Sequence, residues 1–78
     1  MKLEQFSGKK LKARREKEGF TVNKVLAKLW TMGHDKASAQ LLRNYESDVN
    51  VPGMEYALSL ATILKCTVHD FTENGKGK

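Results

Sequence analysis

The sequence predicts an all-α domain, compact and built of five short helices. Apolar residues recur at the three- and four-residue spacing of helices that bury one side. Residues that begin or stop helices stand between these segments. The alternation of apolar and polar residues that would indicate strands is missing from the sequence. Because the chain has 78 residues, we expect a single domain.

The first two helices have recognisable ends. Ser7 is suited to cap a first helix through about Lys17, and Gly19 follows where a C-terminal cap belongs. Thr21 is suited to cap a second helix, predicted at about residues 21–30. The apolar positions of that helix form one stripe, made of Val22, Val25, Leu26, Leu29 and Trp30.

The remainder of the chain alternates loops with helices. Residues 31–36 break the period of the second helix and contain Gly33, so we expect a loop. Pro52 prevents a helix from running through the polar turn around it. The expected elements are a third helix at about 37–46, a nearly all-apolar central helix at about 54–65, a short final turn at 68–71 and a flexible C-terminal tail at 73–78.

The charge distribution favours a polyanionic partner. The chain has 14 basic and 9 acidic residues, a net charge of +5. From Lys2 to Glu18 there are seven basic and three acidic residues, so much of the excess lies in the first quarter. A solvated helix face and a phosphate-binding surface both account for this segment. Nucleic acid is favoured over a membrane surface as the partner.

The composition argues against several other classes of protein. A single cysteine, Cys66, excludes an internal disulfide framework and a cysteine zinc site, and it fits a reducing cytoplasm. His34 and His69 are far apart in sequence and lack further partners for a metal. No catalytic set can be assembled, so we expect no enzyme activity, cofactor, metal or small-molecule substrate. The apolar stretches are too short for a membrane span or a signal peptide.

A spaced pattern of residues over roughly 6–72 carries a family resemblance. Its members are Gly8, Leu11, Arg15, Gly19, Phe20, Thr21, Leu29, Leu42, Tyr45, Glu46, Pro52, Leu60, Ala61, Leu64, Val68 and Phe71. This pattern resembles the lambda-repressor-like helix-turn-helix family, also called the Cro/repressor or XRE family. The resemblance implies a five-helix DNA-binding domain over residues 1–72, with residues about 37–46 as the helix that enters the major groove.

The resemblance also implies which residues contact DNA. Base contacts fall on Ala39, Gln40, Leu41 and Asn44. Gln and Asn can bond to adenine N6 and N7, so Gln40 and Asn44 could read two nearby base pairs. The alternative is that both are ordinary polar residues on a solvated helix face. Phosphate contacts fall on Thr21, Asn23, Lys24, Lys36, Ser38, Arg43 and Ser47.

Arg15 and Glu46 match family positions whose side chains form a partly buried ion pair between the first and third helices. The alternative is that both are surface charges. Two departures from the family pattern concern the DNA surface. The loop 31–36 is about six residues longer than the usual turn, and could supply contacts through His34 and Lys36. Asp48 replaces a turn glycine and is expected to add negative charge near the DNA.

Together these observations predict a cytoplasmic, sequence-specific DNA-binding transcriptional regulator, a repressor of phage or mobile-element type. Its partners would be double-stranded DNA and a weak homodimer strengthened on DNA, with no membrane partner. The alternative is the same helix-turn-helix scaffold used as a protein-interaction or antitoxin-like module.

Overall fold

The computed structural model describes residues 6–72, which form four α-helices and a short 3-10 helix. The elements are α1 (Gly8–Lys17), α2 (Val22–Thr31), α3 (Ala39–Glu46), α4 (Met54–Ile63) and a short 3-10 helix η1 (Val68–Phe71). Between residues 6 and 72 there is no strand, only an isolated antiparallel bridge that joins Phe6 to Thr72. The all-α class is therefore confirmed for this part of the chain. The predicted tail, 73–78, lies outside the described residues.

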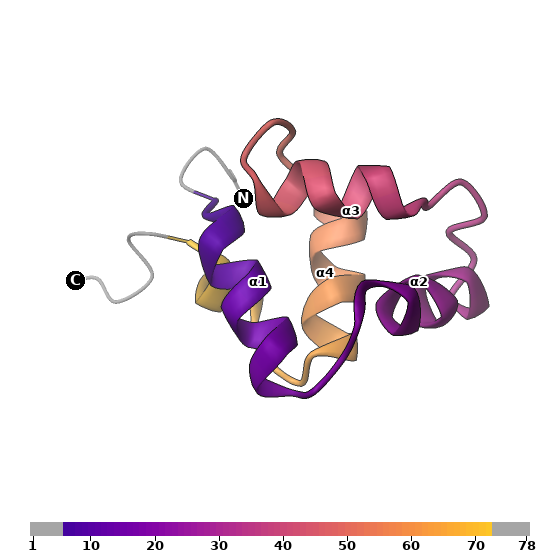
Figure 1. Ribbon diagram of the computed structural model, residues 1–78, viewed down its shortest axis with the longest axis horizontal. Helices are drawn as coiled ribbons and strands as arrows, with labels where there is room; N and C mark the ends of the chain where they lie inside the picture. The colour runs from indigo at the N-terminus through magenta and orange to yellow at the C-terminus, as the bar shows by residue number, and fades with distance from the viewer. Residues whose placement is uncertain (1–5, 73–78) are drawn as a thin grey trace.

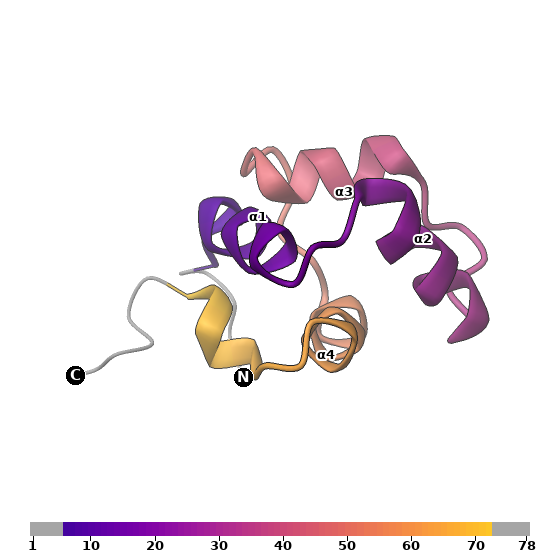
Figure 2. The same ribbon diagram turned by 60° about the horizontal axis from the view of Figure 1, so that its bottom comes forward.

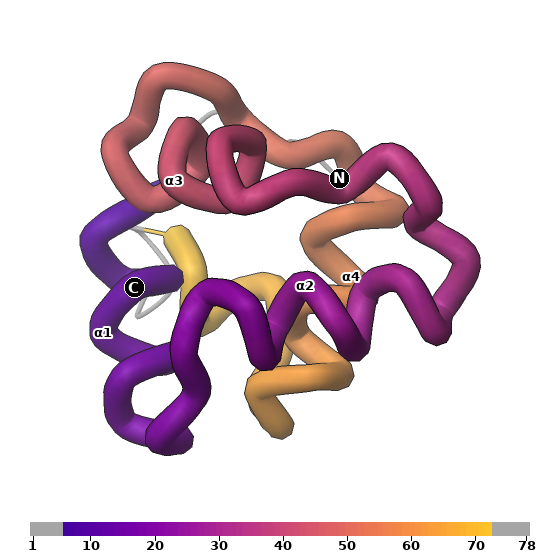
Figure 3. The backbone as a smooth tube through the Cα atoms, turned by 45° about the vertical axis from the view of Figure 1, so that its right-hand side comes forward, coloured from indigo at the N-terminus to yellow at the C-terminus, as the bar shows by residue number. Residues whose placement is uncertain are grey.

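The four α-helices are arranged so that α3 lies across one side of the domain. In Figure 1, α1 and α2 flank α4, and α3 runs along the top. Helix α3 packs against α1 and α2, whereas α4 packs against α2 and η1. Figure 2 shows α3 and α4 on opposite sides of the molecule, and Figure 3 shows α2 passing below α3. One side of α3 is thus supported by two helices, and no described element covers its other side.

The core is centred on α4, as the all-round apolar character of its sequence predicts. Ala57 and Leu60 are fully buried, and so are Leu64 just after the helix and Phe71 of η1. Each fully buried Leu or Phe contributes about 1.5–3 kcal/mol relative to an exposed position. Helices α1, α2 and α3 add the buried residues Leu11, Val25, Leu26, Leu29, Leu42 and Tyr45.

Helix ends follow the local signals closely. The hydroxyls of Ser7, Thr21 and Ser38 each accept a backbone N–H from the residue three positions later. Gly19 has φ +78° after α1, a left-handed conformation that favours glycine. The predicted helix bounds differ from the observed ones by one or two residues. Thr31 still belongs to α2, α3 begins at Ala39 after its cap Ser38, and α4 ends at Ile63 because the chain turns to φ +60° at Lys65.

The start of α1 meets the end of α3 at close range. A Cβ atom on Gly8 would overlap the backbone carbonyls of Tyr45 and Glu46. The Gly8 amide donates to Asp48 Oδ1 at 2.8 Å, and Asp48 itself has φ +65°. The Asp48 carboxylate thus binds the positive N-terminal end of α1. The expectation that Asp48 adds negative charge near the DNA stays a prediction.

The enlarged loop between α2 and α3 folds back onto α4. His34 Nε2 lies 2.7 Å from Ser59 Oγ, and its ring stacks on Tyr56 with centroids 4.4 Å apart. Trp30 Nε1 donates to the Ala37 carbonyl at 2.9 Å and closes the loop from the other side. The His34 side chain is thus engaged with α4, and DNA contacts through it stay a prediction. Lys36, by contrast, is exposed.

Candidate nucleic-acid interface

The uncovered side of α3 carries a stripe of polar residues, here called the α3 stripe: Gln40, Arg43, Asn44 and Ser47. These positions are spaced by three or four residues, so they share one side of the helix. Leu42 and Tyr45 are buried on the opposite side and anchor α3 to the core. Gln40, Arg43 and Ser47 are exposed, and Asn44 is half-buried. The burial of two apolar anchors thus turns the α3 stripe outward.

Gln40 and Asn44 are joined within the α3 stripe. Gln40 Nε2 donates to Asn44 Oδ1 at 2.9 Å. Bonds of this kind between residues one turn apart stabilise a surface helix by about 0.2–0.5 kcal/mol. The amide atoms left outside this bond, Gln40 Oε1 and Asn44 Nδ2, are the acceptor and donor that a partner could use.

Ala39 and Leu41 have a different environment from the other predicted base contacts. Both are half-buried and pack against the hydrophobic core. They lie at the two margins of α3, one on each side of the α3 stripe. The structure therefore gives both residues a packing role, and their predicted base contacts stay predictions.

Most of the predicted phosphate contacts lie at the starts of α2 and α3. Thr21 and Ser38 are the N-caps, so their hydroxyls already accept helix amides. Neither helix has an acidic residue in its first turn to compete with an anion. The side chains at these ends are exposed: Thr21, Asn23, Lys24, Lys36 and Ser38. Both helix starts are therefore open to a phosphate.

A cleft joins the end of α3 to α1 and α2. It has a volume of about 300 Å³ and is lined by Lys12, Arg15, Val22, Arg43, Glu46 and Ser47. Arg15 and Glu46 neutralise each other, so Lys12 and Arg43 give the cleft its positive charge. Lys12 is three residues before Arg15 and so shares its side of α1. That spacing places Lys12 beside Arg15 at this cleft.

Arg15 and Glu46 lie together in a bidentate ion pair. Arg15 Nε is 2.7 Å from Glu46 Oε2, and Arg15 Nη2 is 3.2 Å from Oε1. Arg15 Nη1 also donates to the Phe20 carbonyl at 2.8 Å. The side chains of Arg15 and Glu46 are only 11% and 8% exposed. The pair therefore fixes the end of α3 against α1 and holds the cleft in shape.

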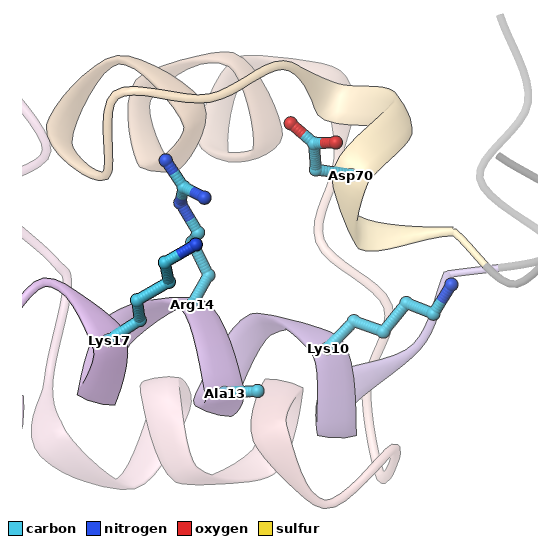
Figure 4. A pocket seen from close by; sticks show the side chains of 5 residues that line it. All are labelled: Lys10, Ala13, Arg14, Lys17 and Asp70. Atoms are coloured by element: carbon cyan, nitrogen blue, oxygen red, sulfur yellow. The ribbon is translucent and has the colours of Figure 1, made fainter. Parts of the chain in front are cut away.

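The other side of α1 carries further basic residues, of which Lys10 and Arg14 make structural contacts. Figure 4 shows Lys10, Arg14 and Lys17 along α1, facing Asp70 across a groove. Lys10 Nζ donates to a backbone carbonyl just after η1, and Arg14 donates to two carbonyls just after α4. Lys10 and Arg14 thus bond to carbonyls at the C-terminal ends of helices, where the helix dipole favours cations. The basic first segment is thus divided between structural contacts and the cleft.

Comparison with known proteins identifies no relative. No family model matches this chain, and neither a curated protein nor a solved structure matches it. No helix between residues 6 and 72 is long and apolar enough to cross a bilayer.

Proposed function

We propose that this chain is a cytoplasmic, sequence-specific DNA-binding regulator of the lambda-repressor-like helix-turn-helix type, acting as a repressor by occupying an operator. One observation supports this proposal most strongly. The α3 stripe lies beside the cationic cleft of Lys12 and Arg43, so groups that can read bases and groups that can hold phosphates share one face.

The dimensions of α3 suit a major groove. An α-helix with its side chains is about 10–12 Å across, and the major groove is about 12 Å wide. Because α1 and α2 support only its inner side, α3 can enter a groove without a change of fold. Gln40 and Asn44 then carry the amide groups that recognise adenine.

Phosphate contacts on both sides would position α3. Lys12 and Arg43 supply charge at the C-terminal end of α3, and the starts of α2 and α3 supply exposed helix amides. Such contacts carry no sequence information but add salt-dependent affinity. A weak homodimer would place two copies of α3 in successive grooves, about one helical turn apart.

Fluorescence anisotropy tests the proposal. The duplexes are a fragment from around the chain's own gene and a random sequence, each titrated over a salt series. The affinity for both should fall steeply with salt, because phosphate contacts release counterions. The fragment should bind more tightly than the random duplex.

Lys12 and Lys17 form a matched pair of variants. Each change to Ala removes one positive charge from α1, but only Lys12 lines the cleft beside α3. Lys12→Ala should reduce the slope of log affinity against log salt by about 1, and Lys17→Ala should leave it unchanged. Equal effects of the two variants would place the DNA elsewhere on the molecule.

A second candidate function has its own observation. Met32 and Leu58 are 43% and 53% exposed, and they border a cleft of about 410 Å³ between the enlarged loop and α4. An apolar side chain of a partner protein would fit this surface. Absence of binding to either duplex at low salt would favour this interaction module over the DNA-binding regulator.

A further inference from the structure

Gln40 and Asn44 are held in a fixed relation within the α3 stripe. Besides the 2.9 Å bond between their amides, the backbone carbonyl of Asn44 accepts amides from Val49 and Asn50 at 2.9 and 3.2 Å. The end of α3 is thus tied to the following loop at Asn44. Asn44 is half-buried, and its side chain holds the amide of the exposed Gln40 through the bond between them.

We propose that Gln40 and Asn44 form one reading unit that recognises a single adenine, instead of two independent readers of two base pairs. This inference depends on the proposed function. The shared bond uses the nitrogen of Gln40 and the oxygen of Asn44. Gln40 Oε1 and Asn44 Nδ2 take no part in this bond, so the unit can present the first as an acceptor and the second as a donor.

An acceptor beside a donor is complementary to the major-groove edge of adenine. Adenine N6–H donates to Gln40 Oε1, and adenine N7 accepts from Asn44 Nδ2. Guanine presents two acceptors and would place its O6 against Gln40 Oε1. Two independent bidentate contacts would require each amide to turn toward its own base pair, whereas the shared bond holds the two amides in one relation.

Selection of bound duplexes from a randomised pool tests the inference, with the full chain as wild type, Gln40→Ala, Asn44→Ala and the double variant. We expect an adenine preference of about 5- to 150-fold at one base pair. Both single variants should lose it at that same base pair. The double variant should lose no more of the adenine preference than either single variant, because either single change already removes the bond that joins the two residues.

Arg43→Ala is the matched control. Arg43 lies in the same stripe but lines the cleft, so its removal should weaken binding to all sequences and leave the adenine preference intact. Preferences lost at two different base pairs, with additive effects, would overturn the shared unit and leave the proposed function standing. A guanine preference at the shared position would overturn it too. Absence of binding to any duplex at low salt would overturn both proposals.

Discussion

The ion pair between Arg15 and Glu46 offers the sharpest test of how the domain is held together. Its two bonds, of 2.7 and 3.2 Å, connect α1 to the last residue of α3, and both side chains are about nine-tenths buried. Glu46→Ala removes the carboxylate and leaves the guanidinium with the Phe20 carbonyl as its one remaining partner among these contacts. The variant therefore contains a largely buried cation without a counter-ion.

The magnitude follows from this burial. Removal of one partner of a buried pair costs about 3–5 kcal/mol, and the residual exposure of Arg15 and Glu46 places the cost near 3 kcal/mol. For a domain of this size, 1 kcal/mol shifts Tm by about 4–8 °C, so Tm should fall by roughly 12–24 °C. Glu46→Gln keeps an oxygen for one bond and should cost less.

Thermal and urea unfolding followed by circular dichroism measure this loss. Glu16→Ala is the control, because Glu16 is an exposed carboxylate on α1 and its removal should change stability by less than about 0.5 kcal/mol. If Glu46→Ala melts within that margin of wild type, the pair has no structural role and the reasoning from its geometry is wrong.

Three further predictions concern the ends of helices. Gly8→Ala should lower the free energy of unfolding, measured in urea, by about 2 kcal/mol, because its Cβ would overlap the Glu46 carbonyl. This loss is expected although alanine favours helix more than glycine does. A variant as stable as wild type would contradict the close approach of α1 to α3. Asp48→Ala should lower the free energy of unfolding by about 2 kcal/mol in the same assay, because it loses the bond to the Gly8 amide and places alanine at a positive φ. Asp48→Asn keeps a side-chain oxygen and should lower it by less than about 1 kcal/mol. Equal losses in the two variants would show that the Asp48 Oδ1 bond to Gly8 has no effect on stability. The Thr67 backbone N–H donates to Asp70 and lowers the pKa of that carboxyl. Its stabilisation should be complete above the unfolded pKa of about 3.9 and lost as pH falls through the lower folded value. Below about pH 4, the Tm of Asp70→Asn should therefore fall less steeply with falling pH than the Tm of wild type. Identical curves of Tm against pH for the two proteins in this range would refute the role of Asp70.

Local sequence information predicts which residues of α3 are exposed, but not how their side chains contact one another. The spacing of Leu42 and Tyr45 predicts which side of α3 is buried, and so places Gln40 and Asn44 outward. It does not predict the bond between their amides, because rotamers of exposed side chains depend on neighbouring atoms. The two residues could be identified as candidates from the sequence, but their joint action could not.

The sequence by itself determined the helices and their caps. Ser7, Thr21 and Ser38 cap helices within three residues of themselves, and apolar periodicity is a property of each segment alone. Only the tertiary structure decided which basic residues of α1 donate hydrogen bonds to backbone carbonyls and which line the cleft. It also brought Asp48 to Gly8 across 40 positions of sequence. Such contacts depend on how the helices cross, and the crossing is set by the packing of side chains from the whole chain.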